Sequence, residues 1–338
     1  QIAHAKMLYL GTFLTVSFIA PMILVVDRRG IEELLWGLIV VGGLVLMGMV
    51  IGTERDAYIH ERMGMSGASA ITTANALVLG AVISLFWWLP RSRRLLPRLA
   101  AAALALGCLG GLISTGSRGP FLFGLVTLGT GGLEYARSLS KNFVNNGLRL
   151  ALIALCLFLA ASGLKASRYS DEFGGSERAL SIVSDDWQTV VRADDRYWLM
   201  KAAVEMIQDK PLLGHGLGGY NRKLSRGDEW DYTYPHNLVL DLGCEAGLPA
   251  ALLLVALYGL AFWRVAGTLI FRPPGGWLEK ALTATTLVLL FSFLEGMVSN
   301  DVFKARYEWG ALGLAFAMSV MVSRVRAAAS SRDGSDPG

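Results

Sequence analysis

The chain alternates long apolar segments with short polar connections, a pattern that predicts membrane-spanning helices. Nine runs approach the roughly 20 apolar residues that cross a bilayer. They fall at about 7–26, 31–51, 69–90, 98–114, 119–134, 148–164, 237–263, 280–298 and 308–323. Glycines within several runs, as in "VVGGLVLMGMV" and "LGCLGGLIS", are typical of membrane helices that pack closely. We therefore expect an all-α, polytopic transmembrane helix bundle with about nine spans.

Composition and charge agree with this interpretation. The 338-residue chain is 53% hydrophobic and only 17% charged, which is too apolar for a soluble globular protein. With the N-terminus outside, the inward connections hold fifteen Lys and Arg and the outward short segments six, as the positive-inside tendency requires. The net charge of +4 therefore reflects topology, and we expect membrane lipids and no nucleic acid as partners. An outward N-terminus without Met or signal peptide also leads us to expect an odd number of spans upstream.

The segment 165–235 breaks the apolar pattern and is predicted to be an extracytoplasmic loop between spans six and seven. Its 71 residues hold 22 of the 58 charged side chains. Within it, "ADDRYWLMKAAVEMIQDKP" predicts a helix ended by Pro211. Its apolar face would comprise Tyr197, Met200, Val204 and Ile207. We expect 165–235 to be a lid on a single transmembrane domain that comprises residues 1–338, rather than an independent fold.

A glycine-rich turn, "GHGLGGY", follows this helix. Gly214, Gly216 and Gly219 match G-x-G-x-x-G, but a dinucleotide site needs a preceding strand and a following helix in an α/β unit, and here a helix and a proline precede the motif. The glycines are instead predicted to allow a sharp turn or a close approach to membrane or ligand. Adjacent backbone N–H groups in such a turn can also cradle an anion.

Polar residues gather at the predicted outer face. Arg118, in "STGSRGPF", occupies a short outward connection, where its plainest role is contact with a lipid headgroup. Arg196 begins the predicted lid helix beside two aspartates, which suggest a local ion pair. His236 stands at the outer end of the predicted span 237–263, and a stripe spaced by four residues continues down it: Asn237, Asp241 and Glu245. Intramembrane carboxylates are usually functional, and a hydrogen-bonded packing network is the alternative.

The sequence does not indicate a metal site. Cys108, Cys156 and Cys244 lie in apolar runs without ligand-like spacing, so we expect buried thiols. The four histidines form no i, i+4 pair and have no cysteine neighbour suited to zinc. We therefore expect neither a metal nor a cofactor.

Three ordered motifs carry a resemblance: "STGSRGPF", "RYWLMKAAVEMIQDKPLLGHGLGGY" and "HNLVLDLGCEAGL". Placed around a large extracytoplasmic loop, they resemble the O-antigen ligase and polymerase family of bacterial integral membrane glycosyltransferases. The resemblance is close over about residues 110–265 and extends to the remaining spans by hydropathy alone. It implies a GT-C-like helix bundle in the inner membrane with its active site facing the periplasm.

The resemblance also implies a chemistry. The donor would be a glycan on undecaprenyl pyrophosphate and the acceptor a lipid A core. Arg118, Arg196 and Arg222 would bind the pyrophosphate, because guanidinium groups offer paired donors to phosphate oxygens. His236 would be the general base, since imidazole titrates near the operating pH. Transfer would invert the anomeric centre without metal or nucleotide, and the supporting residues would orient the base or the donor sugar: Asn237, Asp241 and Glu245.

Several alternatives remain at this point. His215 competes with His236 as the base, and Arg62 and Asn75 are further site candidates from a weaker resemblance in "RMGMSGASAITTANALVLG". A repeat-unit polymerase of the same family would share the donor site and differ in its acceptor. A lipid-linked oligosaccharide flippase is the alternative of another class, but the chain shows no internal repeat, and its polar groups lie near one membrane face.

Overall fold

The computed structural model describes residues 2–51, 53–55, 63–65, 69–137, 195–224, 233–271, 273–299 and 305–333. Within these ranges, seven helices are long and apolar enough to cross a membrane. They are Lys6–Leu24, Arg28–Ile51, Ala70–Arg91, Leu95–Ser114, Leu248–Phe271, Gly276–Gly296 and Arg306–Ser331. The expected all-α, polytopic architecture is confirmed. The predicted span 148–164 lies outside the described residues.

The chain forms two compact units, which we describe separately. Unit 1 comprises residues 1–31, 188–274 and 292–338, and unit 2 comprises 32–187 and 275–291. Residues distant in sequence therefore build each unit.

Unit 2 is built around α4 (Ala70–Ile83), which continues through the π-helical turn η2 (Ser84–Trp88) into α5 (Leu89–Arg91). Twelve of the 14 residues of α4 are buried. Its neighbours are α3 (Arg28–Ile51), α6 (Leu95–Ser114), α7 (Arg118–Arg137) and the first turns of α15 (Gly276–Gly296). A short antiparallel ribbon precedes α4 and consists of β1 (Thr53–Arg55) and β2 (Met63–Met65). The 20-residue α7 occupies the predicted span 119–134 but falls outside the set of seven.

Small residues set the helix spacing in unit 2. A Cβ built at Gly42 of α3 would lie 2.9 Å from the Cα of Gly80 in α4, and one at Gly80 would lie 3.3 Å from Cys108 Sγ in α6. The backbones of α3 and α4 therefore touch where two glycines face each other. The glycine-containing runs of the sequence serve the close helix packing that was predicted for them.

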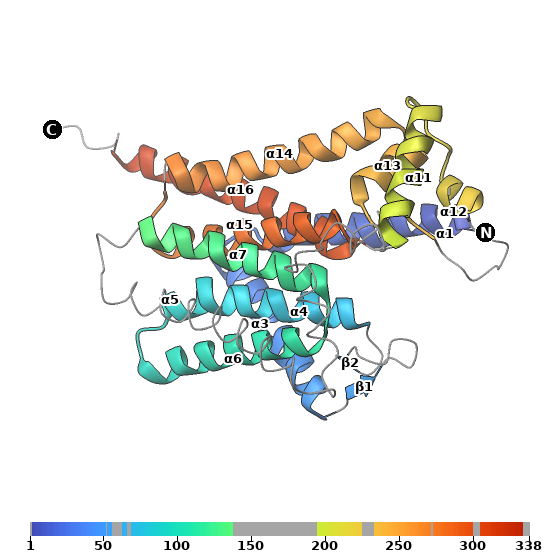
Figure 1. Cartoon of the computed structure of the whole chain (residues 1–338). Helices are drawn as coiled ribbons and strands as arrows, with labels where there is room; N and C mark the ends of the chain where they lie inside the picture. Colours follow the sequence, from blue (N-terminus) through green and yellow to red (C-terminus); the bar gives the residue numbers. More distant parts are fainter. Residues whose placement is uncertain are drawn as a thin grey trace. The chain divides into compact units, whose positions relative to one another are not determined.

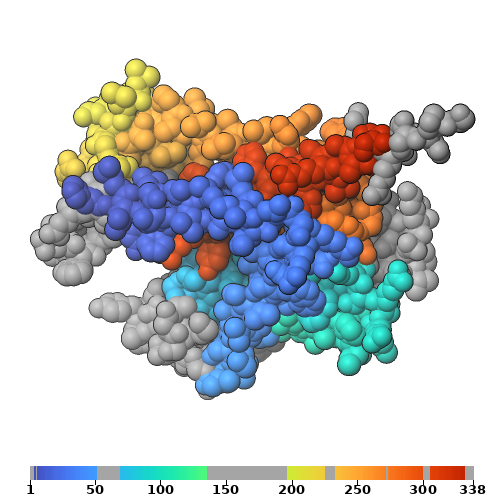
Figure 2. Space-filling view, turned by 180° about the vertical axis from the view of Figure 1, so that it is seen from behind, coloured from blue at the N-terminus to red at the C-terminus, as the bar shows by residue number. Residues whose placement is uncertain are grey.

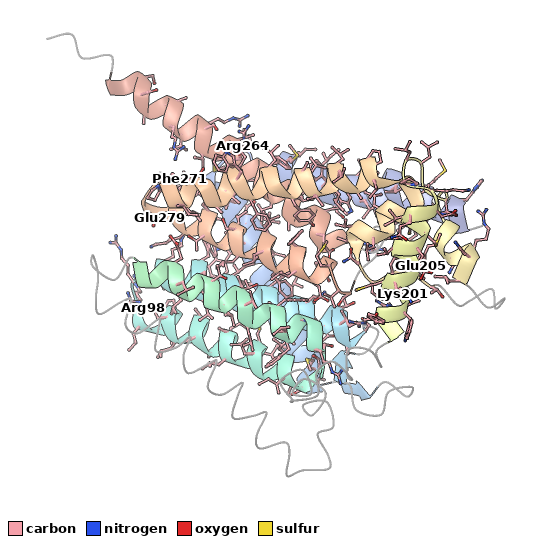
Figure 3. The ribbon with its side chains drawn as sticks, turned by 45° about the horizontal axis from the view of Figure 1, so that its top comes forward. Arg98, Lys201, Glu205, Arg264, Phe271 and Glu279 are labelled. Carbon is pink, nitrogen blue, oxygen red and sulfur yellow. The ribbon has the colours of Figure 1, made fainter. Side chains whose placement is uncertain are left out.

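One end of unit 2 gathers connections that the sequence assigns to the same side of the membrane. Arg91 forms an ion pair with Glu32 at 2.7 Å, and Lys280 Nζ donates to the Pro90 carbonyl at 2.9 Å. Arg91 also lies over the ring of Trp87. Figure 3 shows Arg98 on α6 and Glu279 on α15 at this end. The connections near residues 30, 91–98 and 280 therefore share one side of unit 2, as the positive-inside pattern requires.

Unit 1 contains a long N-terminal helix packed on α16 (Arg306–Asp333). It runs through α1 (Ile2–Tyr9), the π-helical η1 (Leu10–Leu14) and α2 (Thr15–Leu24). A Cβ built at Gly313 would overlap the carbonyl of Phe18, and the Phe18 ring packs edge-on against Trp309 and Phe316. Figure 2 shows this helix, in blue, beside α16, in red.

Three short helices form the head of unit 1: α11 (Asp195–Asp209), α12 (Gly219–Leu224) and α13 (Leu238–Ala246). In Figure 1 they lie at the N-terminal end of α14 (Leu248–Phe271), with α11 running across it. The core of the head contains Ala203, Met206, Tyr220 and Cys244.

The predicted α11 helix is confirmed; its predicted apolar face is correct at Ile207, which packs against the core of the head, and wrong at Tyr197 and Val204. The buried side chains are Ala203 and Met206, whereas Tyr197 and Val204 are each 41% exposed. The buried face is rotated because α11 packs against α12 and α13, and the small Ala203 permits a closer contact than the larger residues chosen from hydropathy.

The predicted continuous span 237–263 is also wrong. The helix breaks at Gly247, which has φ +89°, and α13 packs back against α14. With nine residues, α13 is too short to cross a bilayer. Asp241 and Glu245 therefore lie on a separate short helix of the head and not along the span itself.

The glycine contact in unit 2 predicts opposite effects for neighbouring substitutions. Gly43→Ala gains up to about 1 kcal/mol of helix propensity, because its Cβ would meet only Leu104 Cδ1 at 3.8 Å. Gly42→Ala pushes α3 away from α4 and should destabilise the protein. Thermal unfolding in detergent should show a lower midpoint for Gly42→Ala than for Gly43→Ala; equal midpoints would contradict the close contact.

Candidate functional site

The glycine-rich turn caps the C-terminal end of α13. The N–H groups of His215 and Gly216 donate to the carbonyls of Cys244 and Glu245 at 2.8 and 2.9 Å. Gly214 has φ +62°, and a Cβ there would collide with the backbone of Glu245 and Ala246. The glycines therefore allow the chain to approach another backbone, and the last carbonyls of α13 receive the partners that a helix end needs.

Glu245 joins three separate segments through its side chain. Its Oε1 accepts hydrogen bonds from Lys6 Nζ at 2.5 Å and from the Gly218 N–H at 3.0 Å. Lys6 and Glu245 are only 4% and 3% exposed. An anion does lie against the glycine-rich turn, and it is the carboxylate of Glu245. The sequence left two interpretations of Glu245, a functional carboxylate and a member of a hydrogen-bonded packing network. These contacts favour the packing network.

The His215 side chain contacts the C-terminal half of α11. Its Nε2 lies 3.0 Å from the Met206 carbonyl and 3.5 Å from Asp209 Oδ2. Because a carbonyl only accepts, Nε2 carries the proton in this contact. This arrangement fixes the turn against α11 and gives His215 a structural task.

His236 adopts an unusual backbone conformation immediately before α13. Its φ is +57°, which makes it the one non-glycine residue with positive φ among those that the structure describes. The half-buried imidazole lies against the ring of Tyr234, with centroids 4.1 Å apart. Left-handed backbone at a non-glycine residue is uncommon, although histidine tolerates it better than most, and such conformations cluster at functional sites.

Two consecutive backbone carbonyls after α15 bring the neighbour of His236 close to Arg196. Asn237 Nδ2 donates to the Met297 carbonyl at 3.0 Å, and Arg196 Nη1 donates to the Val298 carbonyl at 3.3 Å. Asn237 Oδ1 also accepts the Leu240 N–H at 2.9 Å and so caps α13. The structure thus brings together two candidates, Arg196 and Asn237, that are 41 residues apart in the sequence.

Buried carboxylates occur beside this region. Asp241, Glu295 and Glu308 are 1%, 1% and 2% exposed. A Cβ built at Gly296 would contact Leu238 and Glu308, so the start of α13 meets the end of α15 and the start of α16. Glu295 and Glu308 were not selected from the sequence, although Glu295 lies inside a predicted span, where a carboxylate is a signal in itself.

The sulfur and phenol groups of the head are protonated packing groups. Burial, followed by the nearby charge of Asp241, raises the pKa of the Cys244 thiol well above its usual range. Burial likewise raises the pKa of Tyr220, whose hydroxyl donates to the Leu199 carbonyl at 2.8 Å. Neither group is a nucleophile at neutral pH.

In unit 2, Arg118 begins α7 after a tight turn. Gly116, with φ +61°, ends α6, and the Thr115 hydroxyl accepts the Ser117 N–H at 3.3 Å. Ser117 and Asn75 are 2% and 4% exposed, and among the described residues Ser117 Oγ and Asn75 Oδ1 have no hydrogen-bond partner. The start of α7 therefore adjoins one buried polar group, the hydroxyl of Ser117.

Two candidates from the sequence remain, Arg222 and Arg62. Arg222 points into solvent from the last turn of α12. Arg62 lies outside the described residues. The ranges that the structure describes contain no group of three or more His, Cys, Asp or Glu residues suited to a metal ion.

The fold and the head define a polytopic membrane protein with a polar site at the ends of its helices. Residues 103–255 match the family model described as O-antigen ligase. A curated protein of Pseudomonas aeruginosa named O-antigen ligase is 28% identical over 270 residues, which cover 78% of this chain and 57% of that protein. Over these residues the chain is similar to the O-antigen ligase family, and the matched region spans 57% of that relative.

Because Lys6 and Glu245 are buried as a pair, replacing Glu245 alone should lower the stability of the fold far more than replacing both residues together. Glu245→Gln leaves the ammonium buried and should cost about 3–5 kcal/mol. The double variant Lys6→Met, Glu245→Gln removes the stranded charge and should recover most of that loss. Thermal unfolding in detergent, followed by near-UV circular dichroism, measures both. A single variant as stable as the parent would refute the burial of the pair.

Proposed function

We propose that the protein is an O-antigen ligase that transfers a glycan from undecaprenyl pyrophosphate to a lipid A core at the periplasmic face of the inner membrane. The observation that carries the proposal is the left-handed backbone of His236, next to Asn237. Asn237 donates to the Met297 carbonyl, and Arg196 donates to the following carbonyl, that of Val298. A base and a guanidinium are thereby held in one region of unit 1.

His236 acts as the general base. Its imidazole removes the proton from an acceptor hydroxyl, and the oxygen then attacks the anomeric carbon of the donor from the side opposite the pyrophosphate. The bond from that carbon to the phosphate oxygen breaks, undecaprenyl pyrophosphate leaves, and the configuration inverts. Contact with Tyr234 and the fixed backbone hold the ring in one orientation, which lowers the entropic part of the barrier.

Arginines stabilise the charge that grows on the pyrophosphate as it leaves. A guanidinium offers five N–H donors, so the bond from Arg196 to Val298 fixes the group while its charge is retained. Arg118, at the first turn of α7, and the exposed Arg222 are proposed as further pyrophosphate ligands from the sequence motifs alone. Such charge stabilisation replaces a metal, because pyrophosphate is already a good leaving group.

The supporting residues have different tasks. Asn237 caps α13 and fixes the position of His236, and the buried Asp241 lies one turn further along the same helix. Glu245 and His215 hold the glycine-rich turn and act on the site only through the position of α13. Asn75, buried in α4, is proposed to orient the donor near Arg118.

Purified protein tests the reaction directly. Incubation with lipid-linked glycan and lipid A core, without added metal or nucleotide, should yield capped lipopolysaccharide. Polymerised lipid-linked glycan as the main product would identify a repeat-unit polymerase instead. Movement of unmodified donor across a vesicle membrane, without transfer, would identify a transporter.

Substitution of the two histidines distinguishes the base. His236→Asn keeps a residue that tolerates positive φ and removes the imidazole, so kcat should fall by about 10²–10⁴. His215→Gln keeps an N–H donor for the Met206 carbonyl and should leave kcat within a few-fold of the parent. The reverse pattern would assign the base to His215. Donor binding, measured separately, should persist in both variants.

Arginine-to-lysine exchange tests pyrophosphate recognition. Arg118→Lys keeps the charge but loses the paired donors, and kcat/KM for the donor should fall by about tenfold. Arg98→Lys, at the opposite end of unit 2, is the matched control and should behave as the parent. Equal kinetics for the two variants would reduce Arg118 to a headgroup contact.

A further inference from the structure

Two adjacent leucines project from the head of unit 1. They belong to the apex, Pro211–Gly214, which joins α11 to the glycine-rich turn. Leu212 is 70% and Leu213 85% exposed. Exposed leucines that neighbour each other on a fixed turn indicate a contact surface, because isolated apolar side chains are common on protein surfaces but grouped ones are not.

The backbone of the apex is rigidly fixed. The Leu248 N–H donates to the Pro211 carbonyl at 2.7 Å, and the Gly214 N–H donates to the Lys210 carbonyl at 3.1 Å. Gly247 packs so tightly against Leu212 that a Cβ there would overlap the Leu212 carbonyl. The two leucine side chains are therefore presented outward by a fixed backbone, and their exposure is a property of the folded head.

The apex continues the apolar surface of a membrane span. Because Leu248 is the first residue of α14, its hydrogen bond to Pro211 places the apex beside the first turn of that span. Leu248, Leu252 and Leu253 on the same turns are 40%, 65% and 62% exposed. A spanning helix exposes such residues to lipid, so the leucines of the apex lie next to a surface that acyl chains cover.

Polar residues mark where this surface ends. Lys210, just before the apex, is exposed, and a lysine at this depth can place its ammonium among lipid phosphates while its stem stays in the apolar region. On α11, Lys201 and Glu205 are exposed and 4.0 Å apart (Figure 3). The head thus has an apolar edge at the apex, while α11 exposes charged side chains together with Tyr197, Trp198 and Val204.

We propose that the apex is a membrane anchor: Leu212 and Leu213 insert among the acyl chains of the leaflet that surrounds the N-terminal end of α14. The partner is the lipid bilayer, and the recognition is apolar side chains with a lysine at the phosphate level. Anchored in this way, α11 and the glycine-rich turn lie on the membrane surface instead of projecting from it. The inference concerns the surface of unit 1 and does not depend on the proposed transfer reaction.

Fluorescence from the apex in lipid vesicles tests the proposal. Leu213→Cys is labelled with an environment-sensitive nitrobenzoxadiazole group, and Glu205→Cys on α11 is the matched control. The parent chain, labelled in parallel, gives the contribution of the native cysteines. In vesicles of phosphatidylethanolamine and phosphatidylglycerol, the label at 213 should emit at shorter wavelength than the label at 205. Phospholipid carrying a nitroxide near the glycerol should quench the label at 213 at least twofold more than the label at 205.

Two outcomes would overturn the proposal. Water-like emission at both positions would mean that the apex lies outside the membrane. Blue-shifted emission at 213 without quenching by nitroxide lipid would mean that protein covers the leucines, either a second copy or another chain. Dilution of the protein in the vesicles then separates these cases, since contact between copies is lost on dilution. The assay uses no substrate, so its failure leaves the proposed transfer untouched.

Discussion

The head of unit 1 depends on the way that the end of α13 is held. A helix end buried against protein needs partners for its last carbonyls, and the glycine-rich turn supplies them through the N–H groups of His215 and Gly216. The side chain of Glu245 completes the joint by binding Lys6 and Gly218. His236 lies just before the capped opposite end of α13, so the helix links the glycine-rich turn and the N-terminal helix to the proposed base.

The two ends of α13 hold polar groups with different contacts. Asn237 and the neighbouring His236 stand at its N-terminal end, where Asn237 binds the Met297 carbonyl and Arg196 binds the next one, that of Val298. Glu245 stands at the other end, where its contacts are with the protein itself. A short helix of nine residues thereby separates the end that packs against the protein from the end at which the transfer reaction is proposed.

Hydropathy predicted most of the fold, because a bilayer requires long apolar helices whatever their tertiary contacts. Hydropathy alone did not predict the break at Gly247, since both flanking helices are apolar; the positive φ and the contact with Leu212 each require a glycine there. The buried face of α11 was missed for a related reason: Ala203 is favoured by its small size, which hydropathy does not register. Sequence motifs predicted His236, Arg196 and Asn237 as site residues. The Met297 and Val298 carbonyls that bind Asn237 and Arg196 could not be predicted, because backbone groups leave no pattern in the sequence. Lys6 and Glu245 pair across 239 residues, a distance beyond any local pattern.

The long separation of Lys6 and Glu245 has a consequence for biosynthesis. At bacterial elongation rates, roughly 5–20 residues per second, the partner of Lys6 emerges from the ribosome on the order of 10–50 seconds after Lys6 itself. During that interval the ammonium has no Glu245 to neutralise it and stays out of the protein interior. Closure of unit 1 therefore follows synthesis of the head, and the helix that carries Lys6 completes its packing only after Glu245 has been made.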